Sequence, residues 1–208
     1  MKNQLLYLSL LCFTAGISQT PVFPVEALYP TEENHPNVKE YYKDIDNLFN
    51  QYEGTWLHES DGKSLKLELK KFELSDHNAY YIDLLIGEYQ YSENGTIIVN
   101  TLSQIENSYT SGCRHSICGY SIEDSCFYHP VSDCIEGEKR IVLHMRDINE
   151  PGISYELILH KRIINLQEAL SVSMGDAYVQ ASFKENETPP TSTIDLNFDN
   201  DLIFLKVE

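Results

Sequence analysis

The densest group of chemically reactive side chains in this sequence is a run of cysteines with two histidines among them. The cysteines are Cys113, Cys118, Cys126 and Cys134, and the histidines are His115 and His129. An even number of closely spaced cysteines in an exported chain is typical of disulfides, and four cysteines allow three connectivities. Zinc is the alternative, but zinc frameworks usually place paired cysteines two to four residues apart, and only the first gap is that short. We therefore predict two disulfides of unspecified connectivity and no metal site.

Residues suited to acid–base or nucleophilic catalysis form no recognisable motif. The chain lacks a G-x-S-x-G elbow, a phosphate loop, an H-E-x-x-H zinc motif and a glycine-rich dinucleotide fingerprint. Glu59 and Asp61 are a candidate glycosidase pair, but Asp61-Gly62 is more typical of a hairpin turn. His144 and His160 alternate with apolar residues, which predicts outward, solvated side chains. We predict no catalytic residue, no cofactor and no enzymatic activity.

Tyrosine is the other abundant polar residue, with 14 in the chain. Tyr89 and Tyr91 are two positions apart, so on a strand they share one face. Aromatic rings with hydroxyl tips can line a carbohydrate or peptide groove. The high strand propensity of tyrosine favours ordinary sheet packing instead.

The N-terminus has the organisation of a secretory signal. Residues 1–18 run from a basic start through an apolar stretch to small residues, with cleavage expected after Ser18. An uncut anchor is the alternative, but the apolar stretch is shorter than the roughly 20 residues that a spanning helix needs. A lipoprotein would need a small residue before Cys12, where this chain has Leu11. We expect exported protein, periplasmic or extracellular, whose intact mass corresponds to a chain that begins near Gln19.

The charge balance limits the partners. The chain has 15 basic and 32 acidic residues, a formal net charge of −17. Such a charge repels nucleic acid and anionic lipid surfaces. No later stretch is apolar enough to cross a membrane, so we predict no nucleic-acid partner and no stable membrane insertion.

The mature chain is expected to contain an extended arm followed by one domain. Residues 19–37 hold four prolines and no periodicity, which indicates the arm, and residues 38–208 form the domain. The domain opens with an apolar stripe at helical spacing, capped by Asn37 and ended by Gly54, which predicts a helix over residues 38–52. The stripe consists of Val38, Tyr41, Tyr42, Ile45, Leu48, Phe49 and Tyr52.

After Gly54 the apolar period changes to two, which is typical of strands with one wet face. A short helix is expected over residues 164–173. The count of eight or nine strands in hairpin order predicts a mainly β fold, an antiparallel barrel or sandwich behind an N-terminal helix. The predicted strands cover residues 64–70, 79–91, 96–102, 140–146, 153–163, 177–183 and 202–207, besides one beginning near Trp56. The residues expected to face the interior together are Leu65, Leu67, Leu69, Ile141, Leu143, Met145, Tyr155, Leu157 and Leu159.

Gly54-Thr55-Trp56 contains the only tryptophan of the chain. Its place between a helix and a long meander resembles the G-x-W motif of lipocalins and other calycins, although the second and third lipocalin signatures are not matched. The resemblance implies an eight-stranded barrel in which Gly54 turns the chain onto the first strand and Trp56 plugs the closed end. A basic residue, Lys206 or Arg162, would cover the indole. We expect Trp56 to be buried with its N–H paired, either under the helical stripe or across the closed end.

A broader resemblance covers most of the chain. Ser18-Gln19-Thr20, Tyr52-x-Gly54-Thr55-Trp56, Gly87 and the closing residues 201–207 are similar to a family of small exported proteins of unknown function from Bacteroidota. This resemblance implies an exported barrel and transfers no activity.

Two functions of different classes follow as expectations. The first is a binding module for a small apolar or amphiphilic ligand, or for a partner protein. The alternative is a structural or interaction protein of the envelope with a filled core and no ligand pocket, and a secreted hydrolase is a distant third. A hollow interior would favour the first.

Overall fold

The strands and short helices come from a computed structural model that describes residues 20–28, 39–127, 133–175, 178–179, 191–196 and 201–207. The predicted signal, residues 29–37 of the predicted arm and His129 lie outside this described part. The short 3₁₀ helices are η1 (Val25–Ala27), η2 (Phe49–Tyr52), η3 (Leu102–Gln104) and η4 (Gly112–Arg114). The strands are β1 (Val22–Pro24), β2 (Glu40–Lys43), β3 (Gly54–Ser60), β4 (Lys63–Asp76), β5 (Tyr80–Glu93), β6 (Thr96–Asn100), β7 (Ile117–Glu123), β8 (Arg140–Arg146), β9 (Ile153–Ile164), β10 (Gln167–Met174), β11 (Tyr178–Val179) and β12 (Leu202–Val207).

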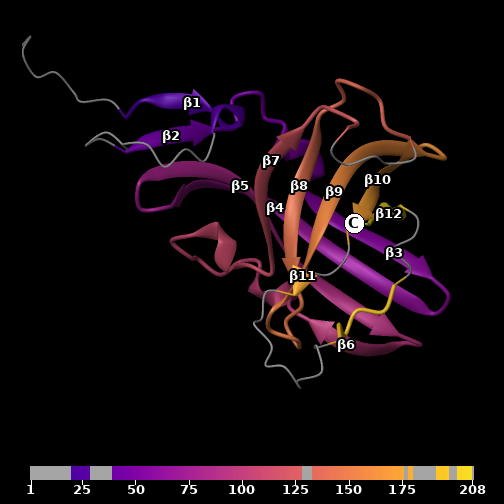
Figure 1. The fold of residues 1–208 in the computed structure, drawn as a ribbon. Helices are drawn as coiled ribbons and strands as arrows, with labels where there is room; N and C mark the ends of the chain where they lie inside the picture. The colour runs from indigo at the N-terminus through magenta and orange to yellow at the C-terminus, as the bar shows by residue number, and fades with distance from the viewer. Residues whose placement is uncertain are drawn as a thin grey trace, which may run out of the picture.

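Eight strands close into an antiparallel barrel (Figure 1). They follow the chain in the order β3, β4, β5, β7, β8, β9, β10 and β12, and each pairs with the next. β12 then pairs with β3 and closes the ring. Full closure removes the free edges that an open sheet would present. The predicted mainly β barrel is therefore confirmed.

The remaining strands extend the sheet outside the barrel. β1 and β2 are the two indigo strands set apart from the barrel in Figure 1, and they are parallel to each other and to the start of β5. β6 forms the predicted hairpin with β5 through Asn94-Gly95, and both turn residues have positive φ. β11 pairs with the start of β9. None of these additions interrupts the barrel ring.

The barrel interior is filled by side chains. The register places Leu67 between Trp56 and Tyr89 across neighbouring strands. An eight-stranded barrel is just wide enough for side chains to fill it. The predicted face parity is confirmed, because all nine residues expected to face inward are buried. The inward side chains that are at most 5% exposed include Trp56, Leu65, Leu67, Leu69, Leu85, Tyr89, Tyr91, Ile117, Ile141, Leu143, Met145, Tyr155, Leu157, Leu159, Leu170, Val172, Met174, Leu202 and Phe204.

The predicted N-terminal helix is wrong. Where residues 39–52 should be helical, the chain forms β2, a turn and the single 3₁₀ turn η2. The expected stripe does not share one face, since Ile45 is 52% exposed while Phe49 is buried. Glu40, which would lie in the first turn of that helix, is in β2 and accepts a hydrogen bond from the Tyr42 hydroxyl.

Two buried carboxylates explain this departure from the helical pattern. Asp83 of β5 accepts hydrogen bonds from the Tyr41 hydroxyl, at 2.5 Å, and from the backbone N–H of Asp44, at 3.0 Å. The Asp44 carboxylate in turn accepts the backbone N–H groups of Leu48 and Phe49. These acceptors satisfy backbone donors that a helix would have used internally, and they come partly from a distant strand.

The short helix predicted over residues 164–173 is also wrong, because this segment continues the meander as β10. Asn165 and Leu166 both have positive φ and form the tight turn between β9 and β10. β10 then bonds to strands on both sides, β9 and β12. The sequence also gave no indication of β7, which lies within the cysteine-rich stretch.

Among the described residues, no helix is both long and apolar enough to span a membrane.

Candidate functional site

Gly54 and Trp56 stand where the chain enters the barrel, as the lipocalin resemblance implies. Gly54 has φ +120°, which disfavours any side chain, and a Cβ there would lie 3.1 Å from Cε of Lys206. Trp56 is fully buried, and its indole N–H donates to the Tyr52 carbonyl of η2 at 2.8 Å. The predicted burial and pairing of the indole are confirmed. Of the two expected placements, the end of the barrel is correct, because Trp56 bonds to the turn that precedes the first strand.

Two lysines lie over the indole face. Lys161 Nζ is 4.6 Å and Lys206 Nζ 5.3 Å from the ring centroid, within cation–π range. Glu168 bridges them at 2.8 and 2.7 Å, and these hydrogen bonds lower the pKa of its carboxyl to about 2. Of the two basic residues proposed to cover Trp56, Lys206 does so. Arg162 instead pairs with Asp133 and Glu138.

The four cysteines form two local disulfides, Cys113–Cys118 and Cys126–Cys134. This is one of the three connectivities that the sequence allowed. No group of metal-ligating side chains occurs among the described residues.

Each disulfide is expected to contribute about 2 kcal/mol to stability, because each closes a short loop. Non-reducing mass spectrometry should find the four cysteines lighter by four hydrogens and inert to alkylation. Serine replacement of either pair should lower the free energy of unfolding by that amount. Stoichiometric zinc in purified protein, or free thiols at these positions, would contradict the prediction.

The histidines and tyrosines singled out in the sequence have separate roles. His144 is exposed on the outside of β8, as predicted, whereas His160 is only 1% exposed and contacts Arg162 at 2.9 Å. His160 is therefore buried and not solvated. Burial is the main cause that lowers the pKa of its imidazole, and the nearby positive charge of Arg162 lowers this pKa further. Tyr89 and Tyr91 share a face, but this face is the barrel core, so they line no groove.

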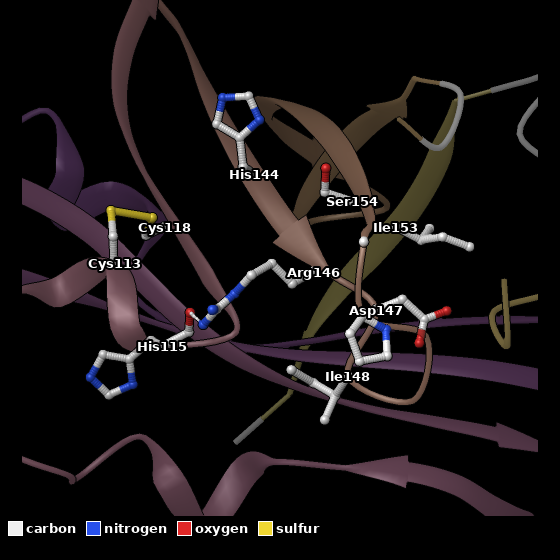
Figure 2. Close-up of a pocket in the computed structure, with 11 residues that line it drawn as sticks. Cys113, His115, Cys118, His144, Arg146, Asp147, Ile148, Ile153 and Ser154 are labelled. Carbon is white, nitrogen blue, oxygen red and sulfur yellow. Dashed lines mark hydrogen bonds between the residues drawn. A yellow bond between two sulfur atoms is a disulfide. The ribbon is translucent and has the colours of Figure 1, made fainter. Parts of the chain in front are cut away.

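A pocket of about 530 Å³ lies on the outside of the barrel, where β7, β8 and β9 meet (Figure 2). The Cys113–Cys118 disulfide borders one side, and His144 and Ser154 border the other. The turn between β8 and β9 completes the wall. The residues that line the pocket are Cys113, His115, Cys118, His144, Arg146, Asp147, Ile148, Pro151, Gly152, Ile153 and Ser154.

Arg146 extends from the end of β8 between these walls, toward the His115 carbonyl (Figure 2). Its Nη2 donates to the backbone carbonyls of Arg114, at 2.8 Å, and His115, at 2.6 Å. Both carbonyls lie inside the loop that the Cys113–Cys118 disulfide closes. The guanidinium is thus held in place by backbone groups and not by a carboxylate.

Asp147, the next residue, is fully engaged elsewhere. Its buried carboxylate accepts the backbone N–H groups of Asn149, Glu150 and Thr193, at 2.8 to 3.2 Å. The hydroxyls of Ser192 and Thr193 add further hydrogen bonds. Asp147 therefore shapes the turn after β8 and ties residues 191–196 to it.

A buried polar cluster lies behind the pocket, on the outer face of β5. Glu88 is fully buried and bonds to His115 Nδ1 at 2.9 Å and to the Ser116 hydroxyl at 2.5 Å. The Ser116 hydroxyl and the His115 imidazole both bond to the Glu88 carboxylate, so the three groups form one buried hydrogen-bonded cluster. This cluster anchors the loop whose carbonyls hold Arg146.

Neither Arg146 nor Glu88 was predicted from the sequence as a site residue. The available signal for Glu88 was a charge in the middle of the long apolar strand 79–91, at a position that shares the outer face with Leu84 and Ile86. No sequence pattern pointed to Arg146, because an arginine at the end of a strand is common. Of the candidate glycosidase pair, Glu59 lies in β3, and Asp61 is the first residue of the β3–β4 turn, with φ +51° as hairpin chemistry requires.

Comparison with known proteins identifies a family but no activity. Neither a curated protein nor a solved structure matches the chain. The model of a family described as "Family of unknown function (DUF6705)" matches residues 1–206. This match spans nearly the whole chain, so the protein belongs to the DUF6705 family.

Proposed function

We propose that this protein is an exported binding module that holds a small amphiphilic ligand in the pocket on the outside of its barrel. A hollow interior was the feature expected of a binding module, and the interior is filled, so the observation that carries the proposal is the pocket outside the barrel. The barrel core is occupied by large buried side chains, three tyrosines among them. The outer pocket of about 530 Å³ is within the range that small-molecule sites occupy.

The lining of the pocket suits an amphiphile. Ile148 and Pro151 provide apolar surface, and Arg146 and His144 provide polar groups. Ligand sites typically combine a mainly apolar lining with a few placed polar groups. Export is supported by the signal-like N-terminus and by two disulfides, which persist in oxidising compartments.

The proposal includes no catalytic step. The described serine, histidine and carboxylate that lie together are Ser116, His115 and Glu88, and all three are buried. Their hydrogen bonds converge on the carboxylate, which supports a role in holding the loop.

A pocket-filling substitution tests the proposal. Ser154 lies on the outer face of β9 in the pocket, so Ser154→Trp should fill the site. Ser121→Trp, on the exposed outer face of β7 and outside the pocket, is the matched control. Native mass spectrometry of protein from its own host should find a co-purifying small molecule on the wild type and on Ser121→Trp. Ser154→Trp should lack it while keeping the same melting temperature within a few degrees. Equal retention by both variants would contradict the proposal.

The alternative of an interaction protein is favoured by one further observation. A second hollow of about 500 Å³ lies on the outer face of β3 and β12. Its lining includes five apolar residues, Leu57, Ile164, Ile203, Leu205 and Val207, and three polar ones, Glu59, Asn165 and Gln167. Leu166 stands at its rim in the β9–β10 turn, 99% exposed. Exposed apolar patches of this kind mark protein contacts. In the same native mass spectra, this alternative predicts a protein-sized addition in place of a small ligand.

A further inference from the structure

We infer that the outer pocket recognises the carboxylate of an amphiphilic monoanion through Arg146, and that the Cys113–Cys118 loop holds this arginine ready for it. This inference rests on the proposed function, since it assigns the ligand class of the same pocket.

Within the described residues of this strongly acidic chain, Arg146 is an arginine without an acidic partner. The chain has 32 acidic and 15 basic residues, and two other arginines have carboxylates within ion-pair distance. Arg162 pairs with Asp133 and Glu138, and Arg140 lies 3.6 Å from Glu123. The described residues provide no such pair for Arg146, although Asp147 is its neighbour in sequence. The oxygens of Asp147 are already occupied by backbone and hydroxyl donors.

The guanidinium keeps unused donors. An arginine has five N–H groups, and the two on Nη2 point to the carbonyls of Arg114 and His115. The N–H groups on Nε and Nη1 have no hydrogen-bond acceptor in the described part of the chain. A carboxylate has the matching acceptors and charge, and hydrogen bonds between two charged groups are the strong ones.

The position of the guanidinium is set before any ligand arrives. Its two carbonyl partners lie in a loop closed by the Cys113–Cys118 disulfide. Inside that loop, the His115 ring is buried against Glu88. Rigid positioning reduces the ordering cost that binding would otherwise incur. The disulfide is therefore a positioning element of the site as well as part of its wall.

The apolar wall and the single cation restrict the ligand further. Ile148 and Pro151 form an apolar wall on the turn between β8 and β9. A ligand with its charge at Arg146 would lay an apolar body along this wall. One cation matches one negative charge, whereas a phosphate dianion would meet the repulsion of a protein with net charge −17. These features favour a carboxylate over a phosphate.

Titration with four probes of equal chain length tests the inference. Octanoate, octanol, octyltrimethylammonium and octyl phosphate would be added to full-length protein and followed by amide NMR shifts at the pocket. Octanoate is expected to bind at least about tenfold more tightly than octanol, the effect of one charge-assisted hydrogen bond. Octyl phosphate should bind more weakly than octanoate, and the cation weakest.

Variants of Arg146 test whether its charge, and not a change in the fold, determines octanoate binding. Arg146→Gln should weaken octanoate binding by about tenfold or more, and change octanol binding by less than about twofold. Arg146→Lys, which keeps the charge but has fewer donors, should fall between. Lys43→Gln removes one positive charge on β2, at a residue outside the pocket lining and outside the loop that holds Arg146, and it should bind octanoate as the wild type does. Amide spectra of each variant check that the barrel is intact.

Failure of the carboxylate inference can be distinguished from failure of the proposed function. If octanol binds as tightly as octanoate, or octyl phosphate more tightly, the carboxylate inference is overturned while the pocket remains a ligand site. Equal losses from Lys43→Gln and Arg146→Gln would likewise overturn the assignment to Arg146. If no probe shifts the pocket amides, the proposed function itself is overturned.

Discussion

Replacement of Trp56 by alanine is expected to lower the free energy of unfolding by about 3–5 kcal/mol, as buried Trp→Ala changes typically do. The side chain is fully buried at the end of the barrel, so alanine would leave a large cavity there. The Tyr52 carbonyl would lose its donor, and the ammonium groups of Lys161 and Lys206 would lose the aromatic face.

Urea unfolding of the wild type and of Trp56→Phe and Trp56→Ala measures this effect. Phenylalanine keeps an aromatic ring but lacks the N–H, so it should cost less than alanine. Because Trp56 is the only tryptophan, wild-type fluorescence reports on it alone. Blue-shifted emission that acrylamide quenches poorly is expected. A red-shifted, readily quenched emission in folded protein would show that Trp56 does not plug the barrel.

Replacement of Glu88 by alanine is expected to cost about 3 kcal/mol, although Glu88 lies outside the barrel core. The change would leave His115 Nδ1 and the Ser116 hydroxyl buried without their partner. Each unsatisfied buried polar group costs about 1–3 kcal/mol. The carboxylate also accepts the backbone N–H of Ser116, so the start of β7 should loosen.

Glu68 provides a matched control for Glu88. It is the same residue type on the neighbouring strand β4, directly opposite Glu88, and only partly buried. Glu68→Ala should change the unfolding free energy by less than about 0.5 kcal/mol. Thermal and urea unfolding of both variants measures the difference. Equal effects at the two positions would show that the Glu88 cluster contributes nothing particular to stability.

The bounds of β8, β9 and β12 were predicted to within one residue. In these segments apolar residues alternate over a full strand, and the alternation records directly which face meets the core. The same physics made Trp56 predictable, because the only indole beside a strand start has a large apolar surface to bury. Burial of single faces is a local property of the sequence.

The helix predicted over residues 38–52 is wrong for a physical reason. Its apolar spacing fits a helix, but short local patterns are weak when a distant strand offers better partners. Asp83 on β5 supplies acceptors for residues that lie some 40 positions earlier in the chain. The segment that forms β10 was predicted as a helix for a similar reason. It pairs with β9 on one side and with β12 on the other, and both partners are set by the tertiary structure.

The sequence by itself determined a mainly β chain with strands in hairpin order, two disulfides, a buried tryptophan and a glycine at the start of the first strand. It did so because periodicity, turn residues and cysteine spacing are local signals. Only the tertiary structure decided that the barrel is filled and that a pocket lies outside it. Arg146, the carbonyls of Arg114 and His115, and Glu88 come from separate strands and loops. Their meeting depends on barrel closure between β5 and β7, and no pattern along the chain records that closure.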